Sequence, residues 1–140
     1  MNEMIIMNNS NDNISKTILI AEDDDISFAY LEIMLSEENC KIIRAFNGLE
    51  AIKMVKSNRE IDFVLMDLKM PVLNGISATY EIRKFNEDIP IIAQTAYVFE
   101  SDRLEALNAG CDDYIAKPFR KHIFLKRMEK YLKNSVDACH

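Results

Sequence analysis

TILIAED (Thr17–Asp23) and FVLMD (Phe63–Asp67) are the stretches that decide the fold. Each is a run of apolar residues that ends in carboxylates. Two further runs, IPIIAQT (Ile89–Thr95) and YIAK (Tyr114–Lys117), end in a hydroxyl and an ammonium group. Continuous apolar runs bounded by turn residues are typical of strands buried in a parallel sheet. Ligands bind beyond the carboxyl ends of such strands, so the sequence predicts a polar site where these four runs end.

Strands and helices are predicted to alternate along the rest of the chain. Strands are expected at Thr17–Glu22, Lys41–Phe46, Ile61–Asp67, Pro90–Thr95 and Asp113–Ala116. Apolar residues at helical spacing predict helices at about Ile26–Glu37, after Asn47-Gly48, and at about Ser77–Phe85, Glu100–Ala109 (with Gly110 as C-cap) and Arg120–Lys133. This alternation predicts an α/β domain with a doubly wound, five-stranded parallel sheet covered on both faces.

The domain is expected to span residues 17–133 of the 140-residue chain. Residues 1–16 are rich in Asn and Ser and are predicted to be a flexible leader or linker, and residues 134–140 a C-terminal tail. No second domain or repeat is visible, and nothing after Lys133 has the length of a DNA-binding helix-turn-helix.

Composition limits the classes of function. A net charge of −6 disfavours direct nucleic-acid binding. The three cysteines are odd in number and form no CxxC motif, which disfavours a disulfide framework or a zinc site and fits a reducing cytoplasm. No apolar stretch approaches the roughly 18–20 residues that a membrane span requires. The expected location is cytoplasmic.

The acidic residues have two interpretations. Glu22, Asp23 and Asp67 converge if the first and third strands are neighbours, and clustered carboxylates either hold a proton or bind a cation. Oxygen ligands without His or Cys suit Mg²⁺. Alternatively, the run Glu22–Asp25 is a solvated turn, with Asp24 or Asp25 as the N-cap of the next helix. The isolated Asp67 favours a site.

Thr95 and Lys117 strengthen that hypothesis. A hydroxyl at Thr95 can bond a phosphoryl oxygen, although Thr is also an ordinary strand residue. Lys117 precedes Pro118, and an X-Pro bond is cis more often than other peptide bonds, which here helps to aim the Lys side chain over the sheet edge. The alternative is a surface Lys at a strand end. The loop DLKMPVLNG after the third strand carries Pro71 and Gly75, with Gly75 expected to permit an unusual turn.

The motifs ILIAEDD, DFVLMDLKMPVLNG, IPIIAQTAY and GCDDYIAKPF, in this order, resemble the receiver domain of two-component response regulators. The resemblance covers about Lys16–Lys133. It implies a flavodoxin-like (βα)₅ fold with strand order 2-1-3-4-5. Gln94 departs from the family pattern, since an apolar residue is usual there, and this departure is expected to perturb strand packing.

The resemblance also implies roles for individual residues. Asp67 is expected to be the phosphoacceptor, and Lys117 to pair with the phosphoryl group. Mg²⁺ is expected to bind Asp23, Asp67 and the main-chain carbonyl of Lys69, and Glu22 through water. Thr95 and Tyr114 are expected to form the switch. Lys69 and Tyr97 occupy positions that vary in the family and tune phosphoryl lifetime.

The implied function is a phosphorelay step. A partner histidine kinase or histidine phosphotransfer protein delivers a phosphoryl group to Asp67, and the face made by the fourth helix, fifth strand and fifth helix then changes shape for a downstream protein. The chain would catalyse only its own phosphorylation and dephosphorylation, and it lacks a Gly-rich nucleotide loop for ATP-dependent kinase activity.

Two enzyme or cofactor classes compete with this interpretation. A haloacid dehalogenase-type hydrolase carries a second Asp two residues after its nucleophile, where this chain has Lys69. A flavodoxin-like cofactor binder needs a Ser/Thr/Gly phosphate loop after the first strand, where this chain is acidic. Within the receiver interpretation, a stand-alone regulator and a receiver module of a hybrid histidine kinase both remain open.

Overall fold

The computed structural model describes residues 15–96 and 99–133, which form one five-stranded parallel sheet with helices on both sides. The strands are β1 (Lys16–Ala21), β2 (Cys40–Ala45), β3 (Phe63–Asp67), β4 (Ile91–Thr95) and β5 (Asp113–Ala116). The helices are α2 (Asp25–Leu35), α3 (Gly48–Ser57), α4 (Gly75–Arg83), α5 (Glu100–Ala109) and α6 (Lys121–Leu132). The strand order is β2-β1-β3-β4-β5, so the predicted doubly wound fold and its order are confirmed. Most of the predicted leader, the predicted tail and Tyr97 lie outside the described residues.

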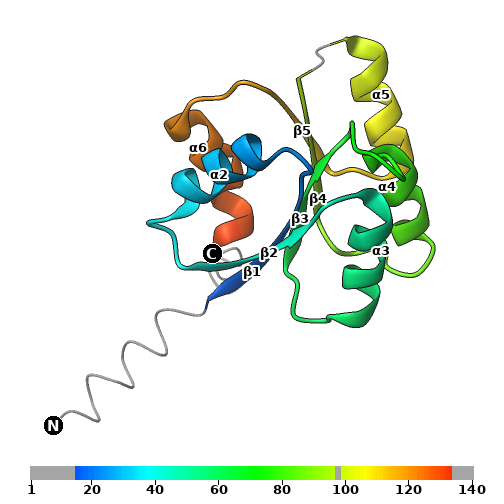
Figure 1. Cartoon of the computed structure of the whole chain (residues 1–140), viewed down its shortest axis with the longest axis horizontal. Coiled ribbons are helices and arrows are strands. Elements are labelled where there is room, and N and C mark those ends of the chain that lie inside the picture. Colours follow the sequence, from blue (N-terminus) through cyan, green and yellow to red (C-terminus); the bar gives the residue numbers. More distant parts are fainter. Residues whose placement is uncertain (1–14, 97–98, 134–140) are drawn as a thin grey trace, which may run out of the picture.

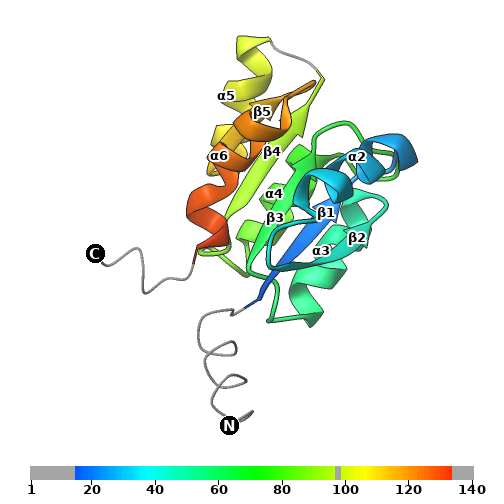
Figure 2. The same ribbon diagram turned by 90° about the vertical axis from the view of Figure 1, so that its left-hand side faces the viewer.

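The helices divide between the two faces of the sheet. Helices α2 and α6 lie together on one face, and α3, α4 and α5 cover the other (Figure 1). The perpendicular view in Figure 2 shows the same division. Alternate residues of β1 follow it: Ile18 and Ile20 join the core under α2 and α6, whereas Leu19 and Ala21 join the core on the opposite face. Burial on both faces explains why the strand sequences are continuously apolar.

The spacing of Phe28, Leu31 and Leu35 predicts one buried stripe in the first helix. Leu31 and Leu35 are buried in α2 and Phe28 is partly buried, so this prediction is confirmed in its main features. In the last helix the sequence predicts a buried stripe of Leu125, Met128 and Leu132, and this stripe is partly displaced. Phe124 and Met128, four residues apart, are the buried pair in α6, while Leu125 and Leu132 are only partly buried.

Element boundaries agree with the predictions within one or two residues at each end. Glu100–Ala109 and Asp113–Ala116 are as predicted. Gly110 ends α5 with a left-handed φ of 118°, which confirms the predicted C-cap. None of the helices in residues 15–96 and 99–133 combines the length and the apolar character needed to cross a bilayer.

The loop between β3 and α4 corrects one prediction. Gly75 does not adopt a left-handed turn; it is the first residue of α4, after the N-cap Asn74. Glycine is required there by close packing, because a Cβ on Gly75 would lie 2.2 Å from the carbonyl oxygen of Asp67. The residue with a positive φ in this loop is the exposed Val72, at 68°.

Candidate functional site

The predicted convergence of carboxylates at the sheet edge is confirmed. β1 pairs with β3 in parallel, with Ala21 opposite Met66, so Glu22 and Asp67 leave neighbouring strands side by side. One carboxylate oxygen from each of Glu22, Asp23 and Asp67 lies within 4.8 Å of the other two. Two of these side chains are buried and Asp23 is exposed, so the cluster opens to solvent on one side.

Glu22 is the most deeply held member of the cluster. Its side chain is 1% exposed. Its Oε1 accepts a hydrogen bond from Lys117 Nζ at 2.7 Å, and its Oε2 accepts one from the backbone N–H of Asp24 at 3.2 Å. The Glu22 carbonyl accepts a bond from Arg44 Nε at 3.0 Å. These hydrogen bonds compensate for the burial of the carboxylate.

The two interpretations of the acidic run apply to different residues. Asp24 is the N-cap of α2, because its carboxylate accepts a hydrogen bond from the backbone N–H of Ser27 at 2.8 Å. This bond also lowers the pKa of Asp24. Asp24 therefore fixes the start of the helix, which leaves Glu22 and Asp23 for the cluster.

Asp67 ends β3 beneath the cation of Lys117. Its Oδ2 lies 3.7 Å from Lys117 Nζ, and its Oδ1 accepts a long hydrogen bond from the backbone N–H of Lys69 at 3.3 Å. Burial raises the pKa of Asp67 to about 7; Lys117 opposes this shift, and the nearby Glu22 adds to it. Two carboxylates thus share one ammonium group, and the cluster can accept a further cation.

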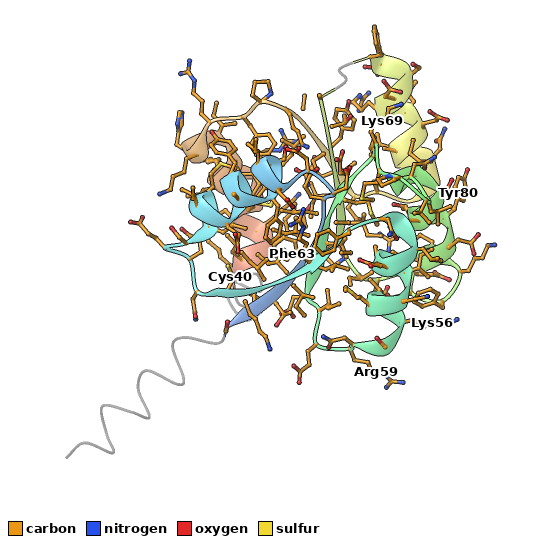
Figure 3. The ribbon with its side chains drawn as sticks, in the orientation of Figure 1. Cys40, Lys56, Arg59, Phe63, Lys69 and Tyr80 are labelled. Atoms are coloured by element: carbon orange, nitrogen blue, oxygen red, sulfur yellow. The ribbon has the colours of Figure 1, made fainter. Side chains whose placement is uncertain are left out.

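The donor atoms fit Mg²⁺. All three side chains offer carboxylate oxygens, the hard ligands that Mg²⁺ prefers. Within the described part of the chain they form the one group of three or more acidic, His or Cys side chains close enough to hold an ion. Lys69 lies in the loop directly beyond Asp67. Figure 3 shows Lys69 and Arg59 at opposite ends of the molecule.

Thr95 and Tyr114 belong to β4 and β5, which lie on the side of β3 away from β1. Thr95 ends β4 and is fully buried, and it lines a cavity of about 300 Å³ together with Lys69 and Asp102. In the β4–β5 pairing, Thr95 lies opposite Ala116 and Ala93 opposite Tyr114. Side chains two residues apart share a face of a strand, so Thr95 and Tyr114 are diagonal neighbours on one face.

Sequence reasoning missed Arg44 of this region and did not foresee where Gln94 lies. Arg44 of β2 holds the Glu22 carbonyl, lies 4.4 Å and 4.1 Å from the ring centres of Phe28 and Phe46, and pairs with Asp25 at 3.0 Å. No motif marks it, since a lone Arg in a strand has many possible partners. Gln94 was noticed only as a departure, and its buried position beside Lys117 became visible in the structure.

Comparison with known proteins decides the family. Residues 18–129 match the response regulator receiver domain family. The chain belongs to this family. Among solved structures, the receiver domain of the sensor histidine kinase PA1611 from Pseudomonas aeruginosa, with a magnesium ion coordinated in its active-site cleft, is 34% identical with a TM-score of 0.78 over 85% of this chain and 98% of that one. The Saccharomyces cerevisiae Ssk1 receiver domain, in complex with the histidine phosphotransfer protein Ypd1, is 32% identical with a TM-score of 0.77 over 84% and 89% of the two chains.

The curated relatives that this chain matches differ widely in length. Transcription factor SKN7 of Saccharomyces cerevisiae is 34% identical over 122 residues, which are 87% of this chain but 20% of that protein. The chain spans 3% of the hybrid signal transduction histidine kinase G of Dictyostelium discoideum and 96% of the response regulator DivK of Brucella anthropi. The receiver domain thus occurs both within hybrid kinases and as nearly the whole of a regulator.

Proposed function

We propose that this receiver domain accepts a phosphoryl group on Asp67 from a phosphohistidine of a partner protein, in a Mg²⁺-dependent step of a phosphorelay. The supporting observation is the position of Lys117 Nζ, 2.7 Å from Glu22 and 3.7 Å from Asp67, at the carboxyl ends of three strands. A nucleophilic carboxylate, a fixed cation and a group of oxygen ligands are what phosphoryl transfer needs, since it rests on positioning and charge neutralisation.

The metal ligands proposed for Mg²⁺ are Asp23, Asp67 and the main-chain carbonyl of Lys69, with Glu22 acting through water. When bound, Mg²⁺ supplies positive charge that offsets the charge on the phosphoryl oxygens. Glu22 accepts from Lys117 through one oxygen and from the Asp24 N–H through the other, so its direct bonds to protein favour the water-mediated role. Asp23 is exposed and free to turn toward an ion from solvent.

In the proposed step, a carboxylate oxygen of Asp67 attacks the phosphorus atom of the donor. A new O–P bond forms, the P–N bond to the donor histidine breaks, and the imidazole nitrogen leaves with the bonding electron pair. Lys117 keeps its proton and pairs with the transferred phosphoryl oxygens. The product is an aspartyl phosphate, and no nucleotide takes part.

The proposed donor is a histidine kinase or a histidine phosphotransfer protein. The Ssk1 receiver domain forms a complex with such a protein, Ypd1. Near the cluster of this chain, the first turn of α2 presents Ile26, 81% exposed, and the loop after β3 presents Val72, 75% exposed. These apolar side chains beside the phosphoacceptor suit a protein partner that must exclude water from the transfer.

The proposed output surface consists of α5, β5 and α6, which are the fourth helix, fifth strand and fifth helix of the fold. Thr95 would bond the new phosphoryl group, and its movement would let Tyr114, its diagonal neighbour, change position. A two-state equilibrium would then be biased by a local charge. A downstream protein, and not nucleic acid, would read this surface in a cytoplasmic setting.

The test is phosphorylation by a small donor such as acetyl phosphate with Mg²⁺, followed by the intact mass of the protein. The wild type should gain one phosphoryl group, and Asp67→Asn should gain none, because the amide is not nucleophilic. Asp88→Asn, in the α4–β4 connection at the opposite edge of the sheet, is the matched control and should behave as wild type. A mass gain in Asp67→Asn equal to that of the control would refute the assignment of Asp67.

A further inference from the structure

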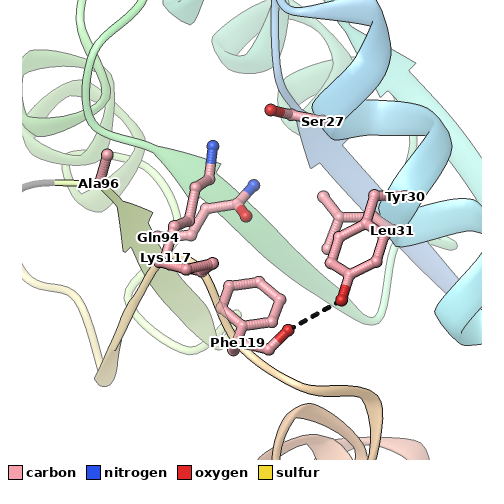
Figure 4. A pocket seen from close by; sticks show the side chains of 8 residues that line it. Ser27, Tyr30, Leu31, Gln94, Ala96, Lys117 and Phe119 are labelled. Carbon is pink, nitrogen blue, oxygen red and sulfur yellow. Dashed lines mark hydrogen bonds between the residues drawn. The ribbon is translucent and has the colours of Figure 1, made fainter.

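A separate cavity of about 340 Å³ lies between α2, the end of β4 and the segment after β5. Tyr30, Leu31 and Phe119 supply most of its apolar wall, and the polar groups in its lining include Gln94 and the stem of Lys117 (Figure 4). This volume is within the range of small-molecule sites, which are mostly apolar with few polar groups.

Gln94 gives this cavity a specific chemistry. The side chain is 1% exposed, and neither its Nε2 nor its Oε1 has a hydrogen-bond partner among the described residues. Figure 4 shows the amide directed from β4 toward α2, across the space that Leu31 and Lys117 border. Buried polar side chains are nearly always paired, because an unpaired buried donor or acceptor lowers stability. The described residues 15–96 and 99–133 therefore supply no partner for this amide.

We propose that the cavity binds a small planar molecule that carries an amide or lactam edge. Such an edge places a donor beside an acceptor, which is the complement of a primary carboxamide. The χ3 angle of Gln is broad, so a small rotation presents both amide atoms to the cavity. The proposal concerns binding alone and does not depend on phosphorylation.

The walls are suited to a flat ring. The Tyr30 hydroxyl donates a hydrogen bond to the Phe119 carbonyl at 3.1 Å, which ties α2 to the segment after β5. The Phe119 ring is stacked on Phe124, with ring centres 5.0 Å apart and planes 10° apart. Two aromatic residues are thus held in place before any ligand arrives, and this limits the entropy lost on binding. A single water, in contrast, would occupy about 30 Å³ and leave most of the cavity empty.

Benzamide and acetophenone form a matched pair of probes, because both are planar and of similar size but only benzamide has the donor. Titration of the ¹⁵N-labelled chain should give saturable NMR shifts of the backbone amides of residues 27–31, 94–96, 117 and 119. Gln94→Leu keeps the size of the side chain and removes the unpaired amide, so the variant should fold. It should weaken benzamide binding about tenfold, the effect of one or two net hydrogen bonds, and weaken acetophenone binding less, because acetophenone can only accept a hydrogen bond from the Gln94 Nε2 group.

Two further variants separate the cavity from the outer surface. Ala96→Leu places a larger side chain in the cavity wall and should weaken binding of both probes. Ile33→Ala changes an exposed residue of α2 and should bind both as wild type does. The proposal is overturned by an absence of saturable shifts, by equal benzamide affinity in wild type and Gln94→Leu, or by a crystal grown with benzamide that shows only water at the amide.

Discussion

Asp67 is buried at a position where ionisation is costly, yet the proposed nucleophilic attack requires the ionised carboxylate. Burial raises its pKa to about 7, against an ordinary value of 3.8. Between these two values the folded protein binds more protons than the unfolded chain. Its stability therefore falls as pH rises through this window and levels off above it. Under the proposed assignment Mg²⁺ would bind the ionised carboxylate, and it should then reverse the loss.

The pH dependence of stability tests whether burial opposes the ionisation of Asp67. With a metal chelator present, the urea concentration at the unfolding midpoint of the wild type should decrease as pH rises from about 4 to about 7. The comparison is with Asp67→Asn, which cannot ionise at this position. Added Mg²⁺ should raise the wild-type midpoint more at neutral than at acid pH, since protons compete for the same oxygens. Parallel midpoints for the wild type and Asp67→Asn across this range would show that Asp67 titrates normally.

At this scale the pattern of carboxylates located the acidic cluster, but only the family resemblance assigned its members separate roles. The run from Glu22 to Asp25 is consistent with a cap and with a metal site, and the structure assigns the cap to Asp24 alone. Strand pairing supplied the missing information, because only the β1–β3 neighbourhood brings Asp67 beside Glu22. Arg44 was unpredictable for the same reason: its partners come from a distant strand end and from α2.

At the scale of elements, the start of α4 packs closely against the end of β3, the strand that carries Asp67. Gly75 begins α4 with its Cα against the carbonyl of Asp67, and its backbone N–H donates to the Leu68 carbonyl at 3.1 Å. The side chain of Asn74 caps the helix by accepting from the Ser77 N–H at 2.8 Å. The start of α4 is therefore locked to the strand that ends in Asp67.

Gly75→Ala tests this lock. The new Cβ would lie 2.2 Å from the Asp67 carbonyl oxygen and 2.9 Å from Met66 Cγ, so the helix or the strand end must move. We expect a loss of about 1–3 kcal/mol in unfolding free energy, as for other overpacked positions, together with weaker Mg²⁺ binding. Ser77→Ala, half a turn further along α4, should be nearly neutral in both measurements. If Gly75→Ala matched Ser77→Ala, the close approach would have no energetic consequence.

Sequence patterns predicted the elements well because burial on both faces makes each strand of this sheet continuously apolar. The stripe predicted in α6 (Leu125, Met128 and Leu132) was less accurate, since Met128 is buried but Phe124 takes the place expected for Leu125 and Leu132. Which of two adjacent apolar residues faces the core depends on the exact rotation of the helix, and that is set by α2 and the sheet together.

At the scale of the whole molecule, the proposed switch connects the phosphoacceptor to the α5–β5–α6 surface through Thr95 and Tyr114. Hydrogen bonds connect the elements of this surface. Arg127 of α6 donates to Asp113 at 2.6 Å and to the Tyr114 carbonyl at 2.8 Å. These bonds hold α6 to β5, so a shift of Tyr114 would be felt by both elements.

Beryllofluoride with Mg²⁺, a stable mimic of the phosphoryl group, allows this connection to be measured by NMR. In the wild type, backbone shifts should extend from Asp67 to residues of α5, β5 and α6. Thr95→Ala should keep the shifts near Asp67 and lose those on the distant surface, whereas Thr95→Ser, which keeps the hydroxyl, should restore them. Distant shifts that persist in Thr95→Ala would exclude the hydroxyl as the link.

The central claim is that one carboxylate of the cluster, that of Asp67, becomes the acyl phosphate. Borohydride reduction converts an aspartyl phosphate to homoserine, so peptide mass spectrometry after reaction with acetyl phosphate and Mg²⁺ identifies the modified residue. We predict homoserine at position 67 and an unmodified Glu22–Asp25 segment. Homoserine at position 23, or reduction at no aspartate of the phosphorylated protein, would contradict the account.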